Sequence, residues 1–149
     1  MNGKRIVLGG LAGGLVMAVL DGVANGLVFG PQWNAAYEKL GLPTMNVGVP
    51  IFWTLFDLLA GVLIAWLAAA MRPRFGSATR AAVYAALVEW GVLHATLASH
   101  AVDGVFPASL LATLAVPELI SALVGGLIAA RLYREREPVL GSHAALASA

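Results

Sequence analysis

Four long apolar runs leave this chain few choices of fold. They cover residues 6–29, 49–71, 81–102 and 107–130. At a rise of about 1.5 Å per residue, a helix of such length exceeds the roughly 30 Å hydrocarbon core of a bilayer. A water-soluble domain of 149 residues could not bury these runs, since 60% of the residues are hydrophobic and only 11% are charged. We therefore expect an all-α fold, an integral membrane bundle of four transmembrane helices.

The connections are short, so residues 1–137 are expected to form a single transmembrane domain, followed by a flexible cytoplasmic tail over 138–149. Between the first two runs, Pro31 precedes Trp33, Tyr37 and Leu40 at the spacing i, i+4, i+7. This pattern predicts a short helix over about 32–40, lying in the outer interface of the membrane and covering the outer end of the bundle. Trp33 and Tyr37 are interpreted as interfacial anchors.

The basic residues indicate an orientation. If the helices alternate in direction, Lys39 is the only one of the 9 Lys and Arg residues on the outer side. Positive charge marks the cytoplasmic side of membrane proteins, so both termini and the turn at 72–80 are predicted to be cytoplasmic, in a bacterial inner membrane. The first run is too long for a cleaved signal peptide and lacks a small-x-small cleavage site, which predicts a retained helix.

Charge and composition exclude several classes of function. A net charge of +1 provides no basic field for nucleic acid. The absence of cysteine excludes disulfides, thiolate metal sites and thiol catalysis. No catalytic triad or phosphate-binding loop is recognisable, so the sequence predicts neither an enzyme nor a bound cofactor. The expected partners are the lipid bilayer and a second copy of the chain or a larger membrane complex.

Each apolar run contains one acidic residue and no Lys or Arg. Placing an Asp near the centre of a membrane helix costs about 2.5–3.5 kcal/mol, so these side chains must face the bundle interior or a partner. Their charge must be neutralised by protons, by a charged histidine, by a bound cation or by a basic residue of another chain. An anionic substrate is therefore disfavoured. The four acids are Asp21, Asp57, Glu89 and Glu118.

Helical phase places most of these acids on small, polar faces. At 100° per residue, Asn25 shares a face with Asp21, and Thr54 shares one with Asp57. Asp21 and Asp57 also lie at a similar depth, about 10–12 Å below the outer surface. The spacings Gly9/Gly13 and Gly10/Gly14 allow close helix approach. We predict one buried polar cluster made of Asp21, Asn25, Thr54, Asp57 and Glu118.

Glu89 and His94 are secondary members of this cluster. They lie about 140° apart around one helix, so that helix cannot aim both at a single point. Either two sites exist, or one of the two residues faces another subunit.

Two classes of function remain open. The favoured one is an accessory or scaffold role, in which protonated acids act as hydrogen-bonding partners between helices and the polar face docks a larger complex. The alternative is a proton- or cation-handling carrier that uses the buried carboxylates. A carboxylate-bound metal or haem is less favoured. Di-iron bundles need Glu-x-x-His, whereas Glu89 and His94 are five residues apart, and a bis-His haem lacks a second ligand.

The opening MNGKRIVLGGLAGG, the outer segment QWNAAYEKLGLP, the inner RPRFG and the closing RLY together resemble a group of small four-helix bacterial membrane proteins with no assigned function. The resemblance covers most of the chain. It implies a bacterial membrane protein of four helices and carries over no substrate or catalytic residue.

Overall fold

The computed structural model describes residues 2–44 and 46–133, which are almost entirely helical. Four helices, counting α1 together with η1, are long and apolar enough to cross a membrane. They correspond to the four predicted runs, so the all-α bundle is confirmed. The tail predicted over 138–149 lies outside the described residues. The elements are α1 (Gly3–Asp21), the π-helix η1 (Gly22–Val28), α2 (Gly30–Lys39), α3 (Gly48–Phe75), α4 (Ala78–Val102) and α5 (Ala108–Leu132).

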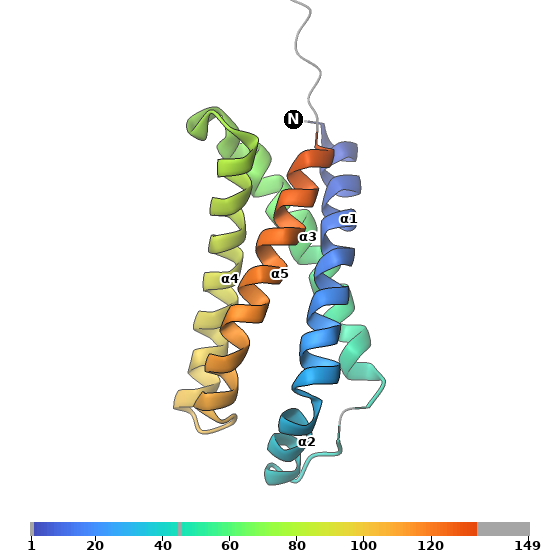
Figure 1. Cartoon of the computed structure of the whole chain (residues 1–149), viewed down its shortest axis with the longest axis vertical. Coiled ribbons are helices and arrows are strands. Elements are labelled where there is room, and N and C mark those ends of the chain that lie inside the picture. Colours follow the sequence, from blue (N-terminus) through green and yellow to red (C-terminus); the bar gives the residue numbers. More distant parts are fainter. Residues whose placement is uncertain (1, 45, 134–149) are drawn as a thin grey trace, which may run out of the picture.

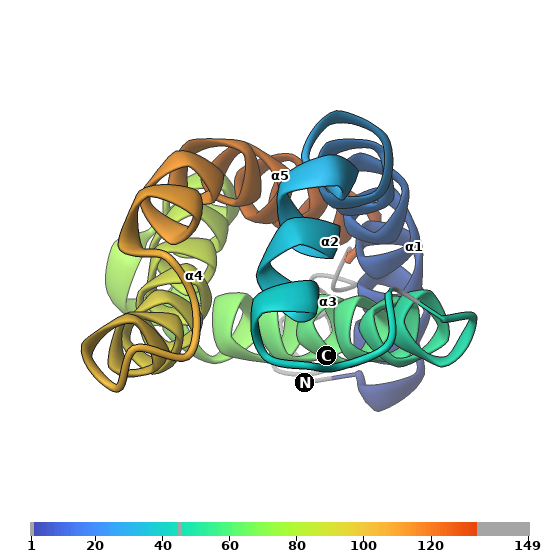
Figure 2. The same ribbon diagram turned by 90° about the horizontal axis from the view of Figure 1, so that it is seen from below.

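The four long helices form a ring in which each runs antiparallel to its neighbours (Figure 1). Helix α1 packs against α3 and α5, and α4 packs against the same two helices from the other side. The short helix α2 lies across one end of this ring (Figure 2). It confirms the helix predicted between the first two runs. Its Ala36 is buried against Leu110 and Leu114 at the start of α5.

The packing faces of α1 consist of glycines that bring backbones into contact. A Cβ atom on Gly14 would lie 2.5 Å from the carbonyl oxygen of Asp57 and 2.6 Å from the Cα of Leu58, both in α3. On the other face, a Cβ on Gly9 would lie 2.9 Å from the carbonyl oxygen of Ala129 in α5. The pair Gly10/Gly14 therefore faces α3, and Gly9/Gly13 faces α5, as close-packed membrane helices require.

Side-chain size is distributed as expected for a bundle surrounded by lipid. The buried positions are mostly alanine and glycine, and Ile64 and Leu114 are the largest apolar side chains that are fully buried. Large apolar residues instead point outward, among them Leu8, Leu59 and Val116. In water such a surface would promote aggregation, whereas in lipid it is well solvated.

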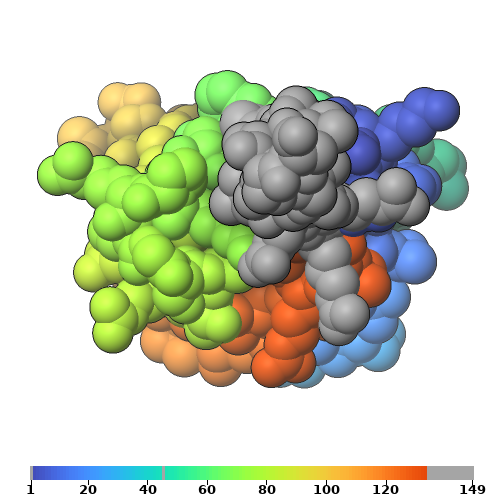
Figure 3. Space-filling model, turned by 90° about the horizontal axis from the view of Figure 1, so that it is seen from above, coloured from blue at the N-terminus to red at the C-terminus, as the bar shows by residue number. Residues whose placement is uncertain are grey.

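At the end of the bundle opposite α2, the connection between α3 and α4 is shorter than the predicted turn at 72–80. Helix α3 continues through Pro73 to Phe75, and the turn into α4 consists only of Gly76 and Ser77. Proline removes a single helical hydrogen bond this close to the helix end, so the helix tolerates it. Gly76 adopts the left-handed conformation with φ 64°, and the Ser77 hydroxyl accepts a hydrogen bond from the Arg80 amide. Figure 3 shows this turn on the same face of the molecule as the ends of α1 and α5.

The first predicted run is not one continuous α-helix. At Gly22 the backbone changes to a π-helix that extends to Val28, and the Phe29 amide donates to the carbonyl oxygen of Ala24, 2.8 Å away. The wider turn shifts the angular position of Asn25 relative to Asp21, which the 100° phase could not predict. π-helical turns are common where a helix carries functional side chains.

The close approach of α1 to α3 predicts the effect of adding one methyl group. Gly14→Ala should lower the free energy of unfolding by about 1–3 kcal/mol, because the new Cβ must displace the α3 backbone. In Gly91→Ala the methyl group would meet nothing within 4 Å, so the better helix propensity of alanine should leave stability unchanged or raise it. Unfolding by SDS in mixed micelles, followed by circular dichroism, measures both. Equal stability of the two variants would contradict the close packing.

Candidate functional site

A cavity of about 190 Å³ occupies the half of the bundle next to α2. Every helix contributes to its wall, from Met17 on α1 to Ala122 on α5. The opposite half of the bundle is closed by small buried side chains such as Ala60, Ala86 and Ala129. The cavity therefore begins where the close packing of glycine and alanine ends.

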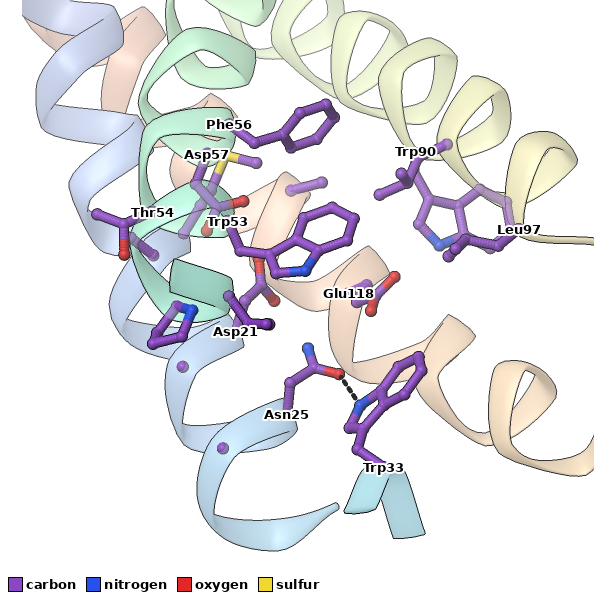
Figure 4. A pocket seen from close by; sticks show the side chains of 18 of the residues that line it. Asp21, Asn25, Trp33, Trp53, Thr54, Phe56, Asp57, Trp90, Leu97 and Glu118 are labelled. Atoms are coloured by element: carbon purple, nitrogen blue, oxygen red, sulfur yellow. Dashed lines mark hydrogen bonds between the residues drawn. The ribbon is translucent and has the colours of Figure 1, made fainter. Parts of the chain in front are cut away.

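All four intramembrane acids line this cavity. Asp21 comes from the end of α1, Asp57 from α3, Glu89 from α4 and Glu118 from α5. Asn25 and Thr54 also line it (Figure 4). The structure thus brings the five residues of the predicted cluster to one cavity and adds Glu89 to them. No Lys or Arg is found among the described residues of the wall.

Two of the acids are buried without a hydrogen bond. Asp57 is only 6% exposed and Glu89 only 8%. Neither side chain has a hydrogen-bonding partner within residues 2–44 and 46–133. The described side-chain atoms that are fully buried and unpaired belong to Asp21, His94 and Glu118, so the carboxyl oxygens of Asp57 and Glu89 open into the cavity and lack a protein partner there. A group that enters the cavity and can donate hydrogen bonds or carry positive charge would supply one.

The other two acids have partners in the protein. The Ser121 hydroxyl donates to one Asp21 oxygen at 2.9 Å, while the second Asp21 oxygen is buried and unpaired. The Asn25 side chain links two parts of the wall, since its oxygen accepts from the Trp33 indole N–H at 3.0 Å (Figure 4). Trp33 is thereby held in place at the cavity.

His94 does not line the cavity but contacts a residue that does. Its Nε2 lies 3.3 Å from a Glu118 oxygen, at ion-pair distance although poorly aligned for a hydrogen bond, and neither atom has another partner. Its Nδ1 lies 3.0 Å from the carbonyl oxygen of Trp90, which can only accept, so Nδ1 carries a hydrogen.

This geometry corrects the expectation that Glu89 and His94 must belong to separate sites or face another subunit. The prediction considered only their angle around α4. Glu118, on α5, joins the two residues although their side chains leave α4 in different directions. It lines the cavity together with Glu89, and it also contacts His94. Both residues therefore belong to one cluster within a single chain.

Aromatic side chains form much of the remaining wall. Trp33 and Tyr37, interpreted from the sequence as interfacial anchors, line the cavity and pack edge-on against Phe106 with ring centroids 5.3 and 6.0 Å apart. Sequence analysis missed Trp53 and Trp90, which lie in the wall on α3 and α4 (Figure 4). Their spacing was a usable signal, since each precedes a polar membrane residue, Asp57 or His94, by one helical turn.

The acids are spread over the wall rather than gathered at one point. Among the residues that the structure describes, no group of three or more His, Asp or Glu side chains lies close enough to hold a metal ion. Comparison with known proteins finds no matching family model, and neither a curated protein nor a solved structure resembles the chain significantly. What the cavity can bind must therefore be inferred from its own chemistry.

The hydrogen bonds predict that Asp21 and Asp57 differ in their effect on stability. Asp57→Leu removes a buried carboxyl group that has no partner, so the free energy of unfolding should stay within about 0.5 kcal/mol of the parent or rise. Asp21→Leu removes the nearer of the two acceptors of the fully buried Ser121 hydroxyl, leaving the Met17 carbonyl oxygen at 3.4 Å, and should lower the free energy of unfolding by about 1 kcal/mol. The same SDS titration measures both. A larger loss for Asp57→Leu would show that Asp57 stabilises the bundle.

Proposed function

We propose that this protein is a membrane carrier that binds a cation in the acidic cavity in exchange for protons. Sequence analysis favoured an accessory role, in which the acids hydrogen-bond one helix to the next. The observation that changes this preference is the pair Asp57 and Glu89, which face the cavity without any hydrogen bond to the described protein. Interhelical hydrogen bonding cannot explain these two residues.

The charge of the wall supports exchange rather than simple binding. A carboxyl group in a largely apolar cavity is stable when it carries a proton or when a cation lies beside it. The described wall contains no Lys or Arg that could neutralise these carboxyl groups instead. A cation that enters must therefore displace protons from the same groups, and this competition couples the two movements. At the cavity edge, His94 lies at ion-pair distance from Glu118.

The shape of the bundle supports access from one side at a time. The cavity lies next to α2, while buried residues such as Ile6, Ala65 and Tyr133 close the other end. A carrier must keep one end closed at a time, because a passage open at both ends would be a channel.

The proposed location is the inner membrane of a bacterium, with both termini in the cytoplasm and α2 outside. The basic residues support this orientation, since Lys4, Arg72, Arg80 and Arg131 lie in the first or last turns of helices at the end opposite α2. Lys39 is the one described basic residue at the α2 end. Positive charge is retained on the cytoplasmic side.

Reporter fusions test this orientation. Alkaline phosphatase folds actively only outside the cytoplasm, so a fusion after Ala149 should be inactive and a truncated fusion after Pro43 should be active. Green fluorescent protein at the same two positions should give the reverse pattern. An active phosphatase after Ala149 would mean that the proposed orientation is inverted.

Proton exchange can be measured in liposomes that contain the purified protein and a pH-sensitive dye. With an acidic lumen, external Na⁺, K⁺ or tetramethylammonium is added in turn, and at least one of them should make the lumen alkaline faster than in protein-free liposomes. Asp57→Asn should slow this exchange by about tenfold or more, because a neutral amide cannot alternate between proton and cation.

Glu38→Gln is the control variant, because Glu38 is an exposed acid on α2 that does not line the cavity. It should exchange at the rate of the parent. If none of the cations causes proton release, or if Asp57→Asn exchanges as fast as Glu38→Gln, the carrier function is wrong and the accessory role is favoured again.

A further inference from the structure

We propose that the cation is a small alkylammonium ion whose charged head is held by Asp57 and Glu89 and whose alkyl groups lie against the tryptophans of the wall. The inference rests on the proposed function, because it names the kind of cation that the cavity takes. It is drawn from the size of the cavity, from the aromatic rings around it and from the hydrogen bonds that orient those rings.

Size favours an organic cation over a bare metal ion. A volume of about 190 Å³ is larger than the cavity of about 150 Å³ that binds benzene in another protein. A single inorganic ion would fill little of it and would need several oxygen ligands gathered around one point. The described acids form no such group. An ammonium ion with a few carbon substituents has a suitable volume and needs fewer oxygen contacts.

The aromatic rings offer the second element of recognition. The face of an indole ring attracts a cation within about 6 Å of its centroid, and alkylammonium groups are bound in this way by cages of aromatic side chains. Trp33, Trp53 and Trp90 line the cavity from three different helices. Phe56 and Phe106 add two further rings to the wall. The acids and the rings thus enclose one volume, which suits a charge surrounded by carbon.

Two of these tryptophans are oriented before any ligand enters. The indole N–H of Trp33 donates to Asn25, and that of Trp90 donates to the carbonyl oxygen of Ala115 at 2.9 Å. With their N–H groups engaged in the protein, these side chains can offer a ligand only the carbon surface of the ring. Because no rotamer freedom is lost on binding, such preorganised rings favour affinity. Trp33 and Trp90 therefore offer no donor to an anion, but they do offer a ring surface to an alkylated cation.

Choline and its neutral analogue 3,3-dimethylbutan-1-ol test the inference, since they have the same shape and differ in charge. The chain has 4 tryptophans, and only Trp66 lies outside the wall of the cavity. In a Trp66→Phe background every indole reports on the cavity. Titration of the full-length protein in detergent should change its fluorescence with a Kd for choline about tenfold or more below that for the alcohol.

Two variants identify the residues responsible. Asp57→Asn should raise the Kd for choline by about tenfold or more, while leaving that for the alcohol unchanged, because only the charged head is affected. Glu38→Gln should bind both compounds like the parent. Equal affinity for choline and the alcohol would overturn the inference and indicate an apolar pocket. Displacement of choline by equimolar K⁺ would overturn it in favour of an inorganic ion.

Binding in detergent requires no transport, so the two proposals can fail separately. If Na⁺ or K⁺ drives proton release in liposomes while choline does not bind, the carrier function stands and the alkylammonium inference is wrong. If choline binds through Asp57 but no cation releases protons, the binding site stands and the carrier function is wrong.

Discussion

Backbone contact between α1 and its two neighbours is the constraint on which the rest of the structure depends. Lipid provides no hydrophobic force between helices, so association must come from dispersion contacts at short range. Gly14 permits this against α3, and Gly13 permits it against α5 at Gly125. At Met17, one turn later on α1, the lining of the cavity begins. The boundary between tight packing and open space thus follows from where the small residues end.

The acids lie at this boundary on every long helix. On α3, Asp57 directly precedes the packed segment that begins at Ala60, and on α4, Glu89 directly follows the buried segment that ends at Ala86. Carboxyl groups are costly in lipid, and at the boundary they reach a cavity while the helix backbones around them remain tightly packed. The aromatic residues continue the wall toward α2. Acidic groups without a Lys or Arg in the described wall, enclosed by rings, make an environment suited to positive charge.

Much of this organisation was predictable from the sequence. The four spans and the short helix between the first two of them follow from local pattern, because hydropathy and helix phase depend on neighbouring residues. Helix phase also selected Asp21 and Asp57 as residues facing the interior. Prediction failed where the backbone departs from an ideal α-helix, as in the π-helical turn after Asp21. It also failed where one residue of a neighbouring helix joins two residues that point in different directions, as Glu118 of α5 does for Glu89 and His94 of α4.

The sequence by itself therefore determined that the chain forms four membrane-length helices and that one acid in each must be shielded from lipid, because both follow from the free energy of transfer of single residues into hydrocarbon. Only the tertiary structure decided that the four acids share one cavity, that Asp57 and Glu89 have no hydrogen-bonding partner among residues 2–44 and 46–133, and that Trp33, Trp53 and Trp90 line the cavity. The reason is physical: cavity shape and hydrogen-bond pairing depend on how close two helices approach, and this distance is set jointly by side chains far apart in the sequence.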